Sequence, residues 1–184
     1  MLIRIQEQYP LSDYPTPSYA LLKALSDSAV GGNNRTGACN VHVANQIGSL
    51  NTPLYAYDFG DVTAPYPAPI YNPPNGNLVG ASHTDELSYL FVNVPLTPAQ
   101  MLTADRMIGY WTNFAATGNP NRKGLPNWPV YKPTEQNVLF ITANSIASDT
   151  DFFERHKCKF WMEQGYNMLA GPYPTPTAGG QVNQ

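Results

Sequence analysis

One short apolar stretch, TPLYAYDFG at residues 52–60, is the clearest strand in the chain and limits what the chain can fold into. It is aromatic and apolar, and turn residues bound it, which is typical of a buried strand. An α/β protein needs several parallel strands covered by helices on both faces. One clear buried strand among helices cannot build such a sheet, so the sequence predicts an α/β segment of a larger fold.

Periodic apolar residues predict helices around this strand. Residues 18–30 carry apolar side chains at a helical period until GGNN, residues 31–34, stops the helix. The Pro- and Tyr-rich segment 1–17 is expected to be extended. Residues 39–50 predict a second helix, whose apolar face is formed by Cys39, Val43, Ile47 and Leu50.

The longest expected helix, residues 97–118, has clear start and stop signals. Thr97 can cap its first turn, Pro98 suits the first helical position and Gln100 completes a capping box. Gly118 can close its C-terminal end. The apolar stripe expected to face the core consists of Met101, Ala104, Ile108, Trp111 and Ala115.

After this helix the sequence predicts two short strands, a last helix and a tail. The strands are NWPVY and NVLFITA, residues 127–131 and 137–143, and the helix spans about residues 150–168. Residues 171–184 have no apolar period and are expected to be a mobile tail, so residues 1–170 form the folded segment of the domain. The core candidates of the last helix are Phe153, Phe160, Trp161 and Met168.

The composition excludes several classes of protein. The chain has 184 residues, of which only 12% are charged, with 18 prolines and 12 tyrosines, which indicates a loop-rich globular protein rather than a disordered one. The net charge is −3 and the ten basic residues are scattered, so no nucleic-acid partner is expected. No window approaches the ~18 apolar residues of a membrane span. The start, MLIRIQEQYP, has no hydrophobic run of signal-peptide length, so no export signal is expected in this chain.

The stretch GASHTDELSYLF, residues 80–91, holds the best candidate for chemistry. His83 follows the strand through a long Pro-rich loop, residues 61–82, and DELSYLF predicts a helix directly after it. Catalytic residues concentrate on loops held by rigid elements, so His83 is a candidate general base, although a structural or merely exposed histidine fits the same pattern. Asp85 and Glu86 are too close in sequence to be assumed its orienting acid, and helix capping explains both equally well.

A serine nucleophile for this base is not evident. The elbow G-x-S-x-G of the α/β-hydrolases does not occur in the sequence, and the nearest string is GASHT, residues 80–84. That string lacks the second glycine and follows a loop rather than a strand. Ser82 is also the immediate neighbour of His83, a poor geometry for a hydrogen bond between the hydroxyl and the imidazole. Ser82 is therefore not expected to be the nucleophile.

Two cysteines, Cys39 and Cys158, allow one disulfide or two free thiols, and their number alone does not decide between these states. A zinc-stapled binding module is an alternative, because Cys39-x-x-His42 and His156-x-Cys158 supply four ligands of suitable softness. Two features oppose it. The second pair is tightly spaced for tetrahedral coordination, and His42 would point away from the helix face that Cys39 shares.

Five stretches, in one order along the chain, resemble the type B carboxylesterases, the family that includes the cholinesterases. The stretches are TPLYAYDF, GASHTDELSYLF, MIGYWTNFAATGNPN, LPNWPVY and HKCKFW, and the resemblance runs from about Tyr14 to Tyr166. They are similar to that family's last core strand, its catalytic-histidine segment, the long helix that follows, a short strand, and the last helix with its cysteine. The resemblance implies the C-terminal part of an α/β-hydrolase fold.

By position, this resemblance makes His83 the general base of a Ser-His-acid triad in a serine esterase. It places Ser82 and Glu86 beside the base, with Glu86 in an electrostatic or water-holding role. It also implies a disulfide between Cys39 and Cys158, which would close a large loop and contribute on the order of 4–5 kcal/mol in the chain-entropy model. No metal or other cofactor is implied, and the substrate would be a small-molecule ester.

In that family the serine elbow, the oxyanion-hole glycines and the acid lie N-terminal to the region matched here, and this sequence contains none of them. The chain is therefore expected to need the missing N-terminal part of the hydrolase fold and to have no meaningful esterase activity by itself. Its full-length parent is expected to be secreted or periplasmic. A non-catalytic recognition protein on the same fold is the remaining alternative, and the retention of His83 argues against it.

Overall fold

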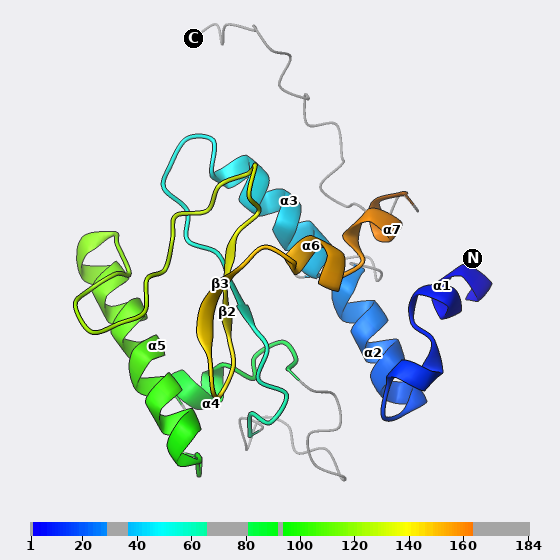
Figure 1. Cartoon of the computed structure of the whole chain (residues 1–184), viewed down its shortest axis with the longest axis horizontal. Helices are drawn as coiled ribbons and strands as arrows, with labels where there is room; N and C mark the ends of the chain where they lie inside the picture. The colour runs from blue at the N-terminus through cyan, green and yellow to red at the C-terminus, as the bar shows by residue number, and fades with distance from the viewer. Residues whose placement is uncertain (1, 29–36, 66–80, 92–93, 164–184) are drawn as a thin grey trace, which may run out of the picture.

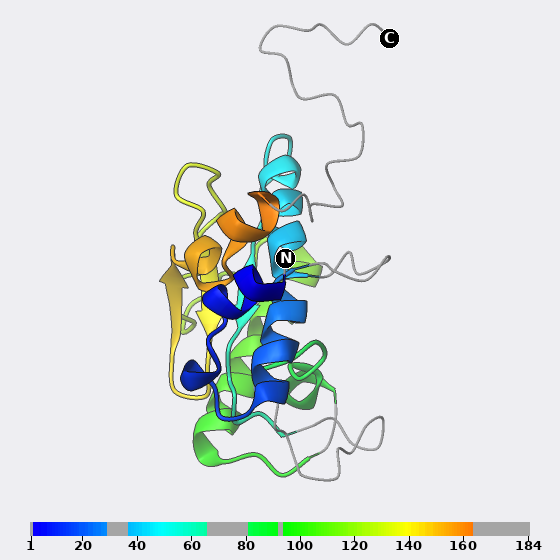
Figure 2. The same ribbon diagram turned by 90° about the vertical axis from the view of Figure 1, so that its right-hand side faces the viewer.

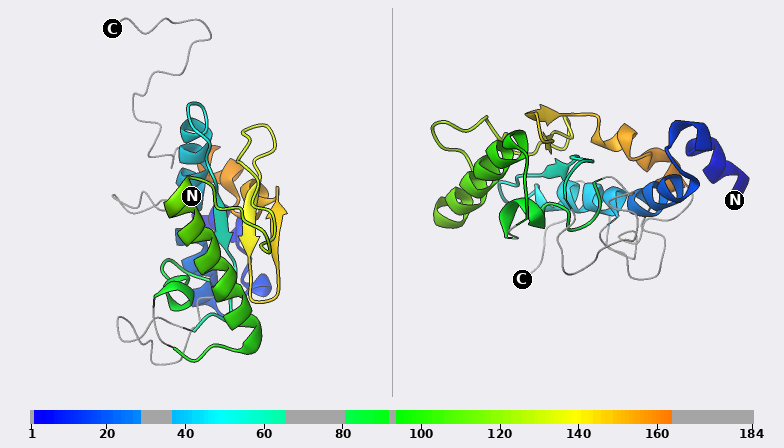
Figure 3. Two further views of the ribbon diagram at one scale, coloured as in Figure 1. Left: turned by 90° about the vertical axis from the view of Figure 1, so that its left-hand side faces the viewer. Right: turned by 90° about the horizontal axis from the view of Figure 1, so that it is seen from below.

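The structure is a computed structural model, and the residues that it describes are 2–28, 37–65, 81–91 and 94–163. In chain order its elements are α1 Leu2–Gln8, a 3₁₀ turn Leu11–Asp13, α2 Pro17–Asp27, α3 Ala38–Gly48, β1 Tyr57–Phe59, α4 Leu87–Leu90, α5 Pro98–Thr117, β2 Val138–Ile141, β3 Ile146–Asp149, α6 Phe152–Arg155 and α7 Cys158–Glu163. In Figure 1 the sheet lies between α5 on one side and α3, α6 and α7 on the other. The view from below in Figure 3 shows the same division, with α4 on the side of α5.

Some predictions concern parts of the chain that the structure does not describe. The tail at residues 171–184, the core candidate Met168 and most of the loop at residues 61–82 lie outside the described residues. Within the described ranges, no helix has the length and apolar character needed to cross a membrane.

The described sheet has three strands in the order β1-β2-β3, so that β3 forms its outer edge (Figure 2). β1 pairs in parallel with β2, with Asp58 opposite Phe140, and β2 pairs antiparallel with β3. The parallel pair requires the long connection that the chain makes through α4 and α5. The strands predicted at residues 52–60 and 137–143 are thus confirmed as β1 and β2, and the mixed sheet with helices on two sides confirms the α/β class.

The strand predicted at residues 127–131 is wrong, because a side chain occupies the backbone groups that a neighbouring strand would need. Asn121 accepts a hydrogen bond from the Trp128 backbone N–H at 2.7 Å and donates one to the Trp128 carbonyl at 2.8 Å. The indole of Trp128 enters the core and donates to the carbonyl of Ala56, next to β1, at 3.0 Å. The segment makes one backbone hydrogen bond toward β1, from the Tyr131 N–H to the Leu54 carbonyl at 2.7 Å, but side chains satisfy its other bonds, so no strand ladder forms.

Helix α5 begins and ends as predicted, but it buries a different face. The capping box of Thr97 and Gln100 closes its first turn, and Gly118 ends it in the left-handed region with a φ of 75°. The predicted apolar stripe is only partly right: Ala104 is buried and Trp111 packs against the core, but Met101 and Ile108 are 50% and 42% exposed. The buried face consists of Gln100, Thr103, Ala104, Met107, Gly109 and Tyr110.

This buried face tolerates polar side chains because their hydrogen bonds are satisfied. Thr103 donates to the Ala143 carbonyl at 3.1 Å, and Gln100 donates to the Thr63 carbonyl at 3.0 Å. A search for apolar periodicity cannot anticipate such pairs. The main core lies between this face and the sheet, and its large side chains include Tyr89, Met107, Tyr110, Trp128, Leu139 and Ile141.

The N-terminal prediction is partly wrong. Residues 1–17 were expected to be extended, but α1 and a 3₁₀ turn occupy much of this segment. The helix predicted over residues 18–30 is confirmed as α2, and Thr16 caps it by accepting the Tyr19 backbone N–H at 3.1 Å. The hydroxyl of the buried Tyr9 accepts the indole N–H of Trp161 at 2.7 Å, so the N-terminal and C-terminal helices share one core.

A disulfide joins Cys39 in α3 to Cys158 in α7, the pair that the family resemblance implies. The two Cα atoms are 5.1 Å apart across a sequence separation of 119 residues. Because this bond uses both thiols, the zinc alternative, in which they would act as ligands with His42 and His156, is wrong. Among the described residues, no group of three or more histidines, cysteines and carboxylates could hold a metal ion.

The last helix is interrupted rather than continuous. The single helix predicted over about residues 150–168 is divided into α6 and α7, and Lys157 lies between them with a φ of 54°, which no right-handed helix accommodates. Phe160 and Trp161 are buried as predicted, whereas Phe153 is only half-buried.

Candidate functional site: the His83 turn

His83 lies in a tight turn directly before α4. The Asp85 backbone N–H donates to the Ser82 carbonyl at 3.1 Å, so His83 and Thr84 are the two central residues of this turn. Thr84 has a φ of 81°, which is costly for a β-branched residue. The His83 side chain is exposed. The turn therefore presents an imidazole on strained backbone, a combination that clusters at functional sites.

The carboxylate of Asp85 closes the same turn from the inside. Its Oδ2 accepts the Ser82 backbone N–H at 2.8 Å and the Ser82 hydroxyl at 3.0 Å. Asp85 is completely buried and bonds back toward Ser82, a contact different from the helix capping that the sequence alone offered for it. The Ser82 hydroxyl is thus engaged with a carboxylate.

Glu86 has a different environment from Asp85. It is half-buried and precedes α4 without making a capping hydrogen bond from its side chain. Burial, with a smaller contribution from the negative charge of Glu86, raises the pKa of Tyr57 to about 12. The Glu86 carboxylate therefore acts electrostatically on β1, the strand that precedes the histidine segment.

A second buried carboxylate, Asp61, anchors α4 to the sheet and to α5. It accepts hydrogen bonds from the Tyr89 hydroxyl of α4 and from the Gln100 amide of α5, the latter at 3.3 Å. Its other oxygen accepts the backbone N–H and the hydroxyl of Thr63 at 2.9 and 2.7 Å. Burial acts to raise the pKa of Asp61, but these hydrogen bonds outweigh it and lower the pKa below its usual range. Asp61 therefore fixes the helix that follows the His83 turn.

Beside α4 the surface opens into a groove between α4 and α5 with a volume of about 480 Å³. Phe91, at the end of α4, is 77% exposed, and Met101 of α5 is 50% exposed. The groove presents polar and apolar surface in similar amounts, and the residues that line it include Ser88, Tyr89, Phe91, Met101, Asp105 and Ile108.

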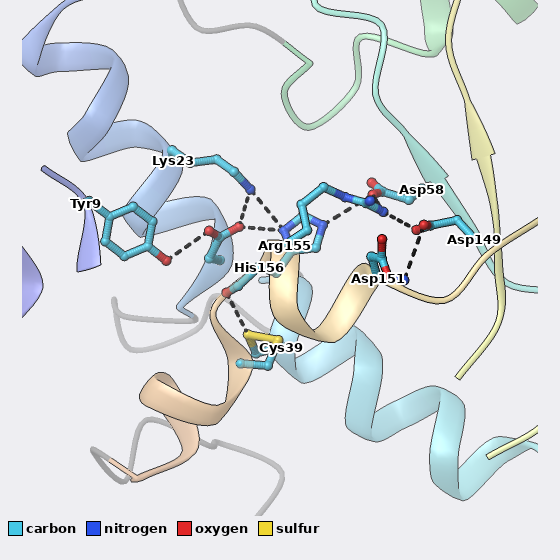
Figure 4. A network of polar contacts seen from close by, with 10 residues as sticks. Tyr9, Lys23, Cys39, Asp58, Asp149, Asp151, Arg155 and His156 are labelled. Atoms are coloured by element: carbon cyan, nitrogen blue, oxygen red, sulfur yellow. Dashed lines mark hydrogen bonds and ion pairs between the residues drawn. A yellow bond between two sulfur atoms is a disulfide. The ribbon is translucent and has the colours of Figure 1, made fainter. Parts of the chain in front are cut away.

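Of the three histidines in the chain, only His83 is exposed. His42 is buried, its ring packs against the aromatic rings of α6, and burial lowers its pKa. His156 is buried with its Nδ1 2.6 Å from a carboxylate oxygen of Asp27 and its Nε2 3.3 Å from one of Asp58 (Figure 4). Only the His83 imidazole is open to a reacting group supplied from elsewhere.

The His156 cluster, defined as Lys23, Asp27, Asp58, Arg155 and His156, joins α2, β1 and α6 (Figure 4). Lys23 pairs with Asp27 at 2.6 Å, and Arg155 pairs with Asp58 at 3.1 Å. The sequence suggested His156 only as a possible zinc ligand, so this cluster was not predicted. The available signal was Asp58 itself, because a carboxylate inside an apolar strand requires a charged or hydrogen-bonding partner.

Comparison with known protein families identifies the family of this chain. Residues 4–161 match the model of the Carboxylesterase family. The chain belongs to this family. The membership confirms the resemblance in the sequence and implies an α/β-hydrolase fold, and the mixed sheet between helices is consistent with part of that fold.

Relatives of this carboxylesterase-family chain agree with the assignment. It is 39% identical over 121 residues to the acylcarnitine hydrolase of Rattus norvegicus, covering 60% of this chain and 19% of the relative. It is 36% identical over 141 residues to the bile salt-activated lipase of Bos taurus, covering 72% of this chain and 21% of the relative. It is 31% identical over 117 residues to the cocaine esterase of Homo sapiens, covering 59% and 19%. The chain thus spans about a fifth of the length of the curated relatives it matches.

For this carboxylesterase-family chain, the structure brings together Ser82, His83 and Glu86 in one turn, as their positions in the sequence require. The sequence did not predict the anchor at Asp61, although an acidic residue directly after a buried strand was a usable signal. The sequence also did not predict that Asp85 is buried and accepts hydrogen bonds from Ser82.

Proposed function

We propose that this chain supplies the general base, His83, of a Ser-His-acid triad in a carboxylic ester hydrolase. The observation that supports this most strongly is that His83 is the single exposed histidine, on a braced turn, while both ring nitrogens of His156 face carboxylates and His42 is buried. Membership of the Carboxylesterase family supports the same reaction class.

The proposed reaction is acyl transfer in two steps. His83 removes the proton of a serine hydroxyl as that oxygen attacks the ester carbonyl, and the imidazolium then protonates the leaving alcohol. In the second step His83 activates a water that hydrolyses the acyl-serine. Glu86 is proposed to stabilise the imidazolium electrostatically or to hold a water beside it, and Ser82 to support the turn.

The serine and the triad acid are proposed to come from the remaining part of a carboxylesterase polypeptide, because the sequence has no G-x-S-x-G elbow. A base without its nucleophile gives little acyl-transfer rate, so the isolated chain is expected to hydrolyse esters no faster than a His83→Ala variant of it. The buried disulfide supports an oxidising compartment, and we place the full-length parent outside the cytoplasm, secreted or periplasmic.

A chimera tests the proposed function. Residues 4–161 of this chain replace the matching segment of the rat acylcarnitine hydrolase, and hydrolysis of a p-nitrophenyl ester is measured. We expect His83→Gln to lower kcat by at least ~10⁴-fold, because the histidine and the serine of such triads act as one unit. Lys123→Gln, an exposed loop substitution, serves as the control and should leave kcat unchanged.

A fluorophosphonate probe separates this function from a non-catalytic recognition role. The probe labels only an activated serine, so the active chimera should be labelled and its His83→Gln variant should not. A folded chimera that hydrolyses the ester equally well with glutamine at position 83 would overturn the proposal. A folded chimera that is neither active nor labelled would favour the recognition role.

A further inference from the structure

We propose that Asp85 is a positioning residue that holds His83 in its reactive orientation by closing the turn through Ser82. This inference rests on the proposed role of His83 as the base. It assigns to Asp85 a task different from that of a triad acid, since Asp85 acts on the backbone that carries the imidazole. It also separates the two adjacent carboxylates, leaving Glu86 as the one that acts by its charge.

The closure consists of hydrogen bonds that run in both directions across two residues. Ser82 donates to Asp85 Oδ2 twice, from its backbone N–H at 2.8 Å and from its hydroxyl at 3.0 Å. The Asp85 backbone N–H donates to the Ser82 carbonyl at 3.1 Å. The acceptor of the first two bonds is a single carboxylate oxygen of a completely buried residue, so water does not compete with Ser82 for it. The two residues enclosed by this closure are His83 and Thr84.

The closed turn is fixed to the rest of the fold on its C-terminal side. The Asp85 carbonyl accepts the hydroxyl of the buried Ser88 at 2.7 Å, and the Thr84 carbonyl accepts the Leu87 backbone N–H at 3.0 Å. One residue further along α4, Tyr89 donates to the carboxylate of Asp61. The position of the turn is therefore set relative to both β1 and α5.

The backbone of the turn opposes this closure. Thr84 is held at a φ of 81°, a value that a β-branched residue leaves when nothing restrains it. Relaxation of Thr84 would rotate the peptide that follows His83 and move the imidazole with it. The hydrogen bonds from Ser82 to Asp85 are the contacts that bracket Thr84 and hold it in this conformation.

The effect on catalysis follows from the short reach of proton transfer. A general base must lie within hydrogen-bonding distance of the hydroxyl that it deprotonates. A displacement of about 1 Å can lower the rate on the order of 10²-fold. Loss of the Asp85 carboxylate should therefore reduce turnover while leaving substrate binding largely unchanged.

Backbone NMR of the 184-residue chain tests the positioning without any need for catalysis. We expect heteronuclear NOE values for the His83 and Thr84 amides that match those of α5. In Asp85→Ala these two values should fall to those of mobile backbone while α5 remains unchanged. Asp85→Asn retains an acceptor for Ser82 and should restore them, and Asp105→Ala, which removes an exposed carboxylate from α5, should have no effect.

Two NMR results would overturn the proposal. One is a His83 amide that is equally ordered with alanine at position 85. The other is a loss of order in Asp85→Ala that extends over α5, because that pattern indicates a general role in stability.

The chimera described above supplies the catalytic arm. Asp85→Ala should lower kcat on the order of 10²-fold with little change in KM, and Asp85→Asn should recover most of the loss. An unchanged kcat in Asp85→Ala would count against the positioning role. If the unaltered chimera is inactive, the proposed function of His83 fails, and the NMR arm still decides whether Asp85 orders the turn.

Discussion

The His83 turn and the His156 cluster each combine a histidine with carboxylates, but they use them in opposite ways. In the cluster, Asp27 and Asp58 face the two ring nitrogens of His156 directly. In the turn, the carboxylate of Asp85 binds the backbone and hydroxyl of Ser82, and the ring of His83 remains exposed. The first arrangement immobilises an imidazole, and the second immobilises only the backbone that carries one.

This difference supports the proposal that His83, rather than His156, acts as the base. A general base needs a ring nitrogen that can accept a proton from a reacting group, and His156 has both nitrogens engaged in the protein interior. A carboxylate near a histidine is therefore a poor indicator of catalysis by itself. The atom that the carboxylate binds is the better indicator, and in the His83 turn that atom belongs to Ser82.

The largest expected difference between the two regions concerns stability. His156→Ala would leave the buried Asp27 and the half-buried Asp58 without their shared partner, and we expect a loss of about 3–5 kcal/mol of unfolding free energy. His83→Ala removes an exposed side chain and should change the unfolding free energy by less than ~0.5 kcal/mol. Urea denaturation followed by tryptophan fluorescence measures both. Equal losses in the two variants would remove the contrast between a structural and an available histidine.

The pH dependence of stability sharpens the comparison. Burial acts to lower the pKa of His156, and Lys23 acts in the same direction, but the hydrogen bonds to Asp27 and Asp58 outweigh them and raise the pKa above its usual value near 6.5. A raised pKa stabilises the folded state fully below pH 6.5. This stabilisation should disappear as the pH rises through the folded-state pKa, by about 1.4 kcal/mol for each unit by which that pKa is raised.

Denaturation at a series of pH values, with two matched variants, checks this expectation. His156→Gln should flatten the decline in unfolding free energy above pH 6.5, whereas His83→Gln should not alter it.

The pKa of Asp58 predicts a second decline in unfolding free energy, at acidic pH. Burial acts to raise this pKa, but the contacts with His156 and Arg155 outweigh burial and lower the pKa below its usual value. A carboxylate with a lowered pKa stabilises the fold above its unfolded value and ceases to do so as the pH falls. A constant stability between pH 6 and 9 in the unaltered chain would contradict the charge assigned to His156.

The smallest expected effect concerns the strain in the His83 turn. Thr84→Gly should raise the unfolding free energy by about 0.5–1 kcal/mol, because glycine adopts a positive φ without the clash that a β-branched residue meets. Thr112→Gly provides a matched control, since Thr112 is exposed within α5 and glycine there should destabilise by about 1 kcal/mol. Thermal unfolding of both variants measures the difference. A destabilising Thr84→Gly would mean that the turn holds no strain.

Local signals in the sequence predicted the local parts of the fold. The capping box at Thr97 and Gln100 and the stop at Gly118 lie within one or two turns of helix, and α5 has these bounds. The loop position of His83 and the helix directly after it were predictable for the same reason, since both depend on neighbouring residues. β3 was not predicted, because Ile146–Asp149 lies at the sheet edge and only its first residue is a buried apolar one.

Contacts across long stretches of chain were not predicted. The pairs that His156 makes with Asp27 and Asp58 span 129 and 98 residues, and no period or motif encodes them. The buried face of α5 was not predicted, because Gln100 and Thr103 donate to backbone carbonyls that lie just after β1 and just after β2. The sequence pattern records which residues are apolar, whereas these features depend on which polar residues find partners.

The disulfide between Cys39 and Cys158 has a consequence for the integrity of the molecule. β1, the His83 turn, α5 and the other strands all lie between these two cysteines in the chain. A single proteolytic cut anywhere in that stretch leaves both products on one covalent molecule, and they separate during electrophoresis only after reduction. The imidazole would therefore remain tethered to its supporting helices after nicking, in any compartment that keeps the sulfur atoms joined.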